Sequence, residues 1–269
     1  MPEGDVLRLT AERLEQALRG APLVRAELRW PSAAGADLTG RTVVSCVAYG
    51  KHLLTRFDDG RTLHTHLRMD GSWRVERTGD RAAAAHRPEV RAVLATARWT
   101  AVGWRLGMLD LGRTHDEAHL LGHLGPDVLG DDFPGDGIDE GVRRLGEQGH
   151  RPLCDVLLDQ RVVAGLGTIW MAETLHALAV HPWTPTGTLD DAALRRLLST
   201  ARRLMGRSVD VGRARGLQHV PRAVHGQLGR PCRRCRTPIA VGQANEPPYE
   251  RPVFWCPTCQ ATHRTDSVG

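Results

Sequence analysis

The chain has 269 residues, of which 41% are hydrophobic and 25% charged, and it carries a formal net charge of +5 with a sequence pI of about 9.2. This composition excludes a disordered or fibrous chain and leaves room for one large or two medium globular domains. Because the sequence holds neither a long apolar run nor a basic-then-apolar start, we expect a cytosolic protein without a membrane span. The positive charge favours a polyanionic partner.

The first five residues, Met1-Pro2-Glu3-Gly4-Asp5, are candidates for chemistry. Removal of Met1 would expose the secondary amine of Pro2, which condenses with an aldehyde carbon to a cationic iminium that acts as an electron sink. The neighbouring carboxylate of Glu3 can shuttle protons. Proline is favoured as the first residue of a helix, and leucines at helical spacing predict a helix over residues 2–20. The alternative is the solvated start of an ordinary amphipathic helix.

The region from residue 23 to residue 106 is predicted to be an antiparallel β-sandwich, with the helix over 2–20 packed on its edge. Short runs alternate between apolar and polar residues there, and Asp58-Asp59-Gly60 is typical of a hairpin turn. Residues 79–88 are expected to form an exposed loop. The predicted strands cover residues 42–47, 52–57, 62–66, 72–75, 89–97 and 100–106.

The second half of the chain changes to helical periodicity. Residues 130–141 are rich in Asp, Gly and Pro and are predicted to be an interdomain linker. Apolar residues at three-to-four spacing then predict helices over 153–163, 168–179 and 189–205. The resulting fold class is α+β, divided into a β-sandwich domain at 1–129, the linker at 130–141, a helical domain at 142–228 and a metal-binding module at 229–269.

The predicted helices on either side of Gly165 and Gly167 are joined by a glycine-rich turn. Glycines allow a backbone phosphate to approach closely, and the amides that open the next helix can bind it. Thr168 is predicted to cap that helix, and Glu173 to occupy a solvated position on it. The alternatives are a helix–turn–helix and a purely structural corner.

Four of the six cysteines form two C-x-x-C pairs, Cys232 with Cys235 and Cys256 with Cys259, separated by twenty residues. Two such pairs can close a tetrahedron of thiolates around Zn²⁺, and the intervening residues suit a β-hairpin. Since all four ligands are protein sulfurs, the metal is expected to be structural. A redox pair is the alternative. Cys46 and Cys154 are predicted to be buried thiols.

Lys51 stands out because it is the only lysine among 36 basic residues. Its compact ammonium offers three rotatable donors that an arginine fork does not copy. Histidines also alternate along the predicted strand at 62–66, and His64 and His66 are expected to pack or face solvent rather than bind a metal.

Four stretches lie in the same order as in the formamidopyrimidine-DNA glycosylase/endonuclease VIII (Fpg/Nei) family, which this chain resembles over essentially its whole length. They are Met1 to Asp5, Tyr49-Gly50-Lys51-His52-Leu53, the helix–two-turns–helix segment at 159–173, and the cysteine hairpin. The start of the chain and Met69-Asp70-Gly71-Ser72-Trp73-Arg74 are more similar to the endonuclease VIII branch, in its actinobacterial form.

The resemblance implies a role for each matching residue. Pro2 would be the nucleophile and Glu3 the general acid/base, with Lys51 and Arg251 completing the catalytic set by gripping phosphates near the lesion. Met69 would fill the gap left by a flipped base. DNA contacts would come from Lys51, Met69, Arg251 and the turn residues Gly165, Gly167 and Thr168.

Three departures from the family pattern bear on these roles. Thr168 stands where the family usually has asparagine, so its phosphate contact has one donor fewer. Val6 replaces a frequent second glutamate, for which Asp5 is a possible substitute. The Asp-Pro-Arg-Arg-Phe-Gly loop of the 8-oxoguanine branch is absent between Arg91 and Leu106, which argues against 8-oxoguanine as the main substrate.

The resemblance therefore implies a monomeric, bifunctional DNA glycosylase/AP lyase. It would excise oxidised bases, pyrimidines above all, from double-stranded DNA and cut abasic sites by β,δ-elimination, with one structural Zn²⁺ per chain. A non-catalytic damaged-DNA-binding protein of the same fold is one alternative. A lyase acting mainly on abasic or single-stranded DNA is another.

Overall fold

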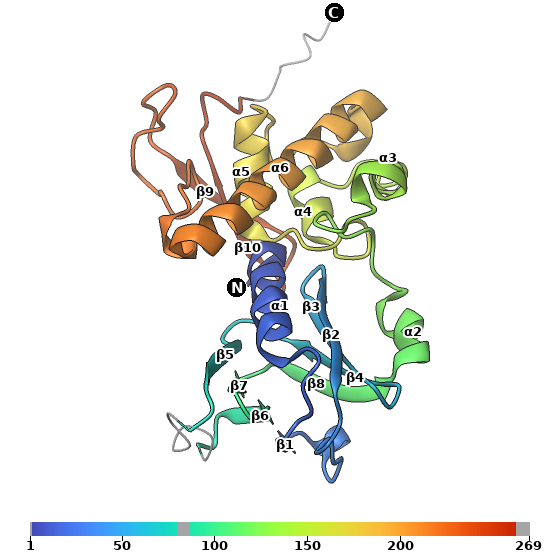
Figure 1. The fold of residues 1–269 in the computed structure, drawn as a ribbon. Helices are drawn as coiled ribbons and strands as arrows, with labels where there is room; N and C mark the ends of the chain where they lie inside the picture. The colour runs from blue at the N-terminus through green and yellow to red at the C-terminus, as the bar shows by residue number, and fades with distance from the viewer. Residues whose placement is uncertain (1, 80–86, 262–269) are drawn as a thin grey trace, which may run out of the picture. The chain divides into compact units, whose positions relative to one another are not determined.

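A computed structural model describes residues 2–79 and 87–261 of the chain (Figure 1). Met1 and most of the loop expected at 79–88 lie outside the described residues. The chain divides into two compact units, residues 1–123 and 124–269. Among the described residues, no helix has the length and apolar character needed to span a membrane.

The first unit is an antiparallel β-sandwich, as predicted. Its two four-stranded sheets have the strand orders β1-β6-β7-β5 and β2-β3-β4-β8. The elements are α1 (Gly4–Leu18), β1 (Arg25–Leu28), η1 (Pro31–Ala33), β2 (Val43–Tyr49), β3 (His52–Phe57), β4 (Arg61–His66), β5 (Ser72–Arg77), β6 (Val90–Ala95), β7 (Trp99–Trp104), β8 (Met108–Arg113), η3 (Thr114–Asp116) and α2 (Glu117–Leu121).

The predicted hairpin between β3 and β4 is confirmed: the strands pair antiparallel, and Gly60 has a positive φ of 77° at the turn. Two strands were not predicted. β1 pairs with β6, and β8 pairs with β4 and completes the second sheet. β8 reads Met-Leu-Asp-Leu-Gly-Arg, whose glycine and aspartate weaken the strand pattern, so its identity depends on pairing with β4.

Helix α1 packs against β2 (Figure 1). It buries one leucine-rich stripe. The stripe holds Leu7, Leu14 and Leu18, all at most 1% exposed, and it joins the core that both sheets share. The predicted bounds 2–20 were too wide. Glu3 takes an extended backbone conformation and the helix begins at Gly4, so Pro2 precedes the helix and is not its first residue.

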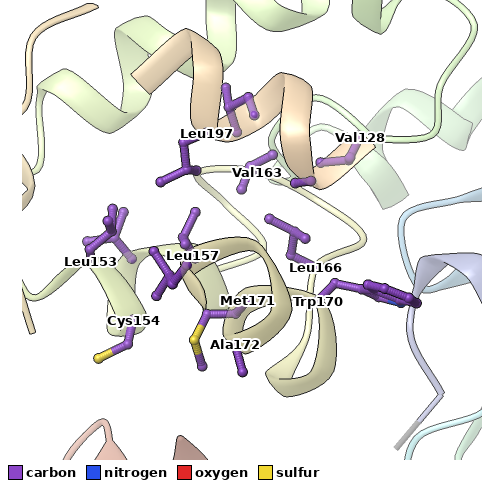
Figure 2. Close-up of a cluster of buried hydrophobic side chains, with 14 of the residues drawn as sticks. Val128, Leu153, Cys154, Leu157, Val163, Leu166, Trp170, Met171, Ala172 and Leu197 are labelled. Atoms are coloured by element: carbon purple, nitrogen blue, oxygen red, sulfur yellow. The ribbon is translucent and has the colours of Figure 1, made fainter. Parts of the chain in front are cut away.

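The second unit is built from helices and a β-hairpin around one core, part of which is drawn in Figure 2. Its elements are η4 (Phe133–Gly137), α3 (Ile138–Gly146), α4 (Leu153–Leu158), α5 (Thr168–Ala177), η5 (Thr186–Thr188), α6 (Asp191–Arg215), η6 (Leu217–His219), β9 (Ala240–Ala244) and β10 (Arg251–Trp255). The helices expected at 153–163, 168–179 and 189–205 are present with shifted ends.

The range 130–141 differs from the linker expected there. The compact units divide between His123 and Leu124, and 130–141 contains η4 and the start of α3. Phe133 is fully buried in the core of the second unit, so one aromatic side chain holds this Gly- and Asp-rich stretch in the fold. The finer division at 228/229 stays a prediction.

Candidate functional site

The start of the chain carries a buried acidic residue, Glu3. Glu3 is 1% exposed, and its carbonyl accepts hydrogen bonds from the amides of Val6 (2.9 Å) and Leu7 (3.2 Å). Asp5, in the first turn of α1, is also buried. Pro2 is half-buried directly before Glu3. The secondary amine proposed as a nucleophile and the carboxylate proposed as its proton shuttle are thus consecutive residues at a helix start.

Lys51 lies at the tip of the β2–β3 hairpin. Tyr49 pairs with His52, so Gly50 and Lys51 form a two-residue turn, and Gly50 has a φ of 55°. A glycine at the first central position is what a type II′ hairpin turn requires. Lys51 is only 6% exposed, so the fold holds its ammonium in place instead of leaving it on a solvated loop.

Three histidines from β3 and β4 cluster beside Lys51. His52 Nδ1 lies 2.8 Å from His64 Nε2, and the His66 ring meets His52 edge-on with centroids 5.0 Å apart. Burial lowers the pKa of His52 to about 3 and that of His66 to about 4, and the Lys51 charge contributes in both cases. The cluster is therefore neutral at neutral pH. His64 is buried, which is one of the two outcomes expected for it. The sequence did not indicate its partnership with His52.

Met69 stands at the apex of the turn after β4 and is 63% exposed. The amide of Arg68 donates to His66 Nδ1 at 2.8 Å, and the amide of Gly71 donates to the carbonyl of Leu67 at 3.0 Å. A Cβ on Gly71 would come within 2.4 Å of that carbonyl oxygen. The turn thus depends on a glycine, and it displays a flexible apolar side chain to solvent.

The turn between α4 and α5 is organised by the amide side chain of Gln160. Its Nε2 donates to the carbonyls of Leu158 (3.0 Å) and Leu166 (2.9 Å), and its Oε1 accepts from the amide of Gly165 (3.0 Å). Gly165 has a φ of 99°, a conformation that favours glycine. One side chain therefore replaces the backbone pairing that this non-helical stretch lacks.

The start of α5 differs from the prediction in one detail. Gly167, with an extended backbone, is the capping position, and Thr168 is the first helical residue. Thr168 is therefore not the cap that the sequence suggested. Gly167 and Thr168 still open a ten-residue helix whose N-terminal amides carry partial positive charge.

Glu173 is buried rather than solvated, with 7% of its surface exposed. Its carboxylate accepts hydrogen bonds from the backbone amides of Ala223 (2.8 Å), Val224 (3.0 Å) and His225 (2.8 Å). It thus ties the segment before the cysteine hairpin to α5. Glu173 lies within a run that is buried on every side of the helix, and that apolar context was the available signal.

The four predicted metal ligands meet at one point. The sulfurs of Cys232, Cys235, Cys256 and Cys259 all lie within 4.8 Å of one another. Two of the separations are 3.3 and 3.9 Å, and a tetrahedral Zn–S₄ centre has S···S edges of roughly 3.8 Å. Hydrogen bonding by Thr237 lowers the pKa of Cys235 to about 6, whereas burial raises the pKa of Cys259 to about 12. The donor set and its spacing fit a tetrahedral thiolate site.

Arg251 begins β10 and pairs across the hairpin with Ala244. Its Nη1 donates to the carbonyls of Glu250 (2.9 Å) and Tyr249 (3.4 Å), so the guanidinium braces the tip of the hairpin. The isolated cysteines are buried as predicted, and burial raises the pKa of Cys46 to about 12. Pro2, Glu3, Lys51 and Met69 belong to the first unit, and the other predicted site residues belong to the second.

Two family models match most of this chain. Residues 1–125 match the family model described as the formamidopyrimidine-DNA glycosylase N-terminal domain, and residues 124–218 match its H2TH domain. The fold is similar to that of Lactococcus lactis formamidopyrimidine-DNA glycosylase non-covalently bound to DNA containing an AP site. The TM-score is 0.82 at 23% identity, over 96% of this chain and 99% of that one.

Two curated relatives are closer in sequence. The chain is 44% identical to the "Probable endonuclease 8 2" of Streptomyces coelicolor, over 97% of this chain and 94% of that protein. It is 37% identical to the "DNA-(apurinic or apyrimidinic site) lyase Nei2" of Mycolicibacterium smegmatis, over 97% and 99%. The chain therefore belongs to the formamidopyrimidine-DNA glycosylase/endonuclease VIII family.

Proposed function

We propose that this chain is a bifunctional DNA glycosylase and AP lyase of base excision repair that acts as a monomer on double-stranded DNA. The observation that carries the proposal is Pro2 directly before the buried carboxylate of Glu3, in a chain that belongs to this family. The names of the two relatives, an endonuclease 8 and an AP lyase, support both halves of the activity. Oxidised pyrimidines are the proposed main substrates.

The chemistry follows from the two groups. The Pro2 amine attacks C1′ of the damaged nucleotide, the bond to the base breaks, and the base leaves with a proton supplied by Glu3. Glu3 takes the N–H proton of the attached Pro2 and passes it to O4′, so that the sugar ring opens to a cationic iminium at C1′, which acidifies the C2′–H bond. Loss of that proton expels the 3′ phosphate, a second elimination expels the 5′ phosphate, and hydrolysis of the iminium frees Pro2.

The remaining site residues are proposed to hold the DNA. Lys51, fixed at its hairpin tip, and Arg251, at the cysteine hairpin, would contact phosphates. Gly165, Gly167 and Thr168 would present backbone amides and a hydroxyl to another phosphate. Met69, exposed at its turn, would enter the stack where the base has left.

The four cysteines are proposed to bind one Zn²⁺ as a structural ion. When bound, the metal supplies cross-links that hold the hairpin together and takes no part in the reaction. Cys232 and Cys256 are fully buried within the core of the second unit. The metal-binding thiolates are therefore expected to stabilise that unit as well as the hairpin.

A second candidate function is a lyase that acts mainly on abasic sites. The name of the Mycolicibacterium relative, at 37% identity, favours it. The same residues would carry this activity, since a preformed abasic aldehyde needs no glycosidic cleavage. The two functions can be distinguished by comparing activity on DNA that carries a damaged base with activity on DNA that carries a preformed abasic site.

Borohydride trapping tests the proposal directly. Protein with a free Pro2, verified by intact mass, should form a covalent adduct with duplex DNA containing an abasic site or thymine glycol. Retention of Met1, which removes the free Pro2 amine, should abolish trapping while leaving DNA binding intact. Pro2→Gly should reduce trapping without abolishing it, because its primary amine still forms a reducible imine. Adduct formation with the abasic duplex alone would favour the lyase. If protein with a free Pro2 formed no adduct with either duplex, the result would favour a DNA-binding protein without catalytic activity.

A further inference from the structure

An arginine outside the predicted site has an unusual environment. Arg222 lies between α6 and the cysteine hairpin, and its guanidinium carbon is 5.6 Å from the centroid of the Trp170 ring. Its Nη1 is buried and has no hydrogen-bond partner in the described part of the chain. Within residues 2–79 and 87–261, no carboxylate forms an ion pair with Arg222. The group therefore combines a full charge, a stacked face and an unsatisfied donor.

The backbone around Arg222 is held firmly. The next three residues donate their amides to the Glu173 carboxylate at 2.8 to 3.0 Å. Trp170, on the same helix as Glu173, lies at the margin of the core, where its ring extends away from the other labelled side chains (Figure 2). The guanidinium is thus positioned by the ring of Trp170 and by a backbone segment that Glu173 of the same helix anchors.

A buried charged donor without an acceptor is costly, so an acceptor is expected to reach it in the working state. Arg222 as a whole is only half-buried, so part of its side chain reaches the surface, and a guanidinium fork matches the oxygens of a phosphate. The nearby carboxylate of Glu173 is already used by three amides. Burial lowers the pKa of His225 to about 4, so this neighbour adds no charge at neutral pH.

Trp170 is the third residue of α5, the helix that opens at Gly167 and Thr168. The helix N-terminus and Arg222 are therefore two positive features close together, and both select an anion. We propose that Arg222, stacked on Trp170, binds a non-bridging phosphate oxygen of the DNA backbone. This proposal rests on the proposed function for its ligand, DNA, but it does not depend on catalysis.

The test is the salt dependence of binding to a duplex with a tetrahydrofuran abasic analogue, which the protein cannot cleave. Arg222→Gln should weaken binding about 10-fold near 0.1 M salt and lower the slope of log Kd against log salt by about 0.9, as loss of one phosphate contact predicts. Arg222→Lys should keep the slope, because it keeps the charge. Arg196→Gln, at an exposed position on α6, is the matched control and should match the wild type.

Cleavage assays distinguish a phosphate from a base as the partner. If Arg222 binds phosphate, Arg222→Gln should slow excision of thymine glycol and cleavage of a preformed abasic site equally. Slower excision alone with an unchanged salt slope would overturn the proposal and assign Arg222 to a base carbonyl. A lower thermal midpoint with unchanged affinity and rates would also overturn it, because the guanidinium would then only pack on Trp170. If the wild type binds DNA but cuts nothing, the proposed function fails while the slope test still decides this inference.

Discussion

His52 and His64 are joined ring to ring, with Nδ1 of the first 2.8 Å from Nε2 of the second, so that one imidazole donates its N–H to the other. The rings come from neighbouring strands behind Lys51 and stack with centroids 5.0 Å apart. Nδ1 of His64 is buried without a partner. The arrangement requires neutral rings, since a proton added to the shared pair would place a buried charge beside the lysine.

Acid should therefore destabilise the protein through His52. Its pKa is about 3 in the fold against an ordinary 6.5, so below pH 6.5 the unfolded chain takes a proton that the folded chain refuses. The contribution of His52 to the free energy of unfolding is fully present above pH 6.5 and is lost as the pH drops toward 3. Between pH 7 and 5 this residue should lower the free energy of unfolding by about 1–2 kcal/mol. Urea denaturation at several pH values measures it.

The variant His52→Gln should be less stable at pH 7 but lose less stability on going to pH 5. His115→Gln, at an exposed position, should retain the wild-type slope. Equal slopes for wild type and His52→Gln would contradict the burial of a neutral imidazole pair.

Gln160→Leu should destabilise the turn that precedes α5. The change keeps side-chain volume but removes hydrogen bonds to Leu158, Gly165 and Leu166. Three lost bonds predict a cost of about 3 kcal/mol, together with weaker DNA binding because the glycine turn loses its shape. Urea denaturation and a binding titration measure the two effects. Gln16→Leu, at an exposed position, is the control. If both variants lost equally little stability, the hydrogen bonds of Gln160 would not be what holds the turn.

Gly71→Ala and Met69→Ala should separate the shape of the Met69 turn from its function. A Cβ at residue 71 meets the Leu67 carbonyl oxygen at 2.4 Å, so Gly71→Ala should cost about 2 kcal/mol or more of stability. Met69 is 63% exposed, so Met69→Ala should keep the wild-type thermal midpoint and slow only the excision of damaged bases. A destabilised Met69→Ala variant would show that this side chain packs in the fold.

Removal of the metal should unfold more than the hairpin. Cys232 and Cys256 are fully buried in the core of the second unit, so chelation of Zn²⁺ should lower the thermal midpoint by about 10 °C or more and abolish DNA binding. Metal analysis should find one zinc per chain, and none in Cys256→Ser. Cys46→Ala, which alters a cysteine outside the cluster, should keep its zinc. Zinc-free protein with an unchanged midpoint would refute the assignment.

Local patterns were enough to predict much of this molecule. The two C-x-x-C pairs indicated a four-thiolate cluster because a tetrahedral site constrains spacing within short loops. Alternation along β3 and the Asp-Asp-Gly turn predicted a hairpin, because period-two burial and turn chemistry are properties of neighbouring residues. The family was identifiable for the same reason: its motifs are contiguous, and they include Pro2-Glu3 and Gly50-Lys51.

The tertiary structure decided what depends on residues far apart in the chain. The sequence around Glu173 predicts a solvated side chain. In the structure its carboxylate is buried and accepts hydrogen bonds from the amides of residues 223–225, which follow α6 in the chain. His52 and His64 become partners only through the β3–β4 register, and Phe133 turns an expected linker into part of a core. Sequence determines which groups are present and how neighbours are spaced, whereas long-range packing determines which of them lose water and so acquire partners, shifted pKa values or unsatisfied donors.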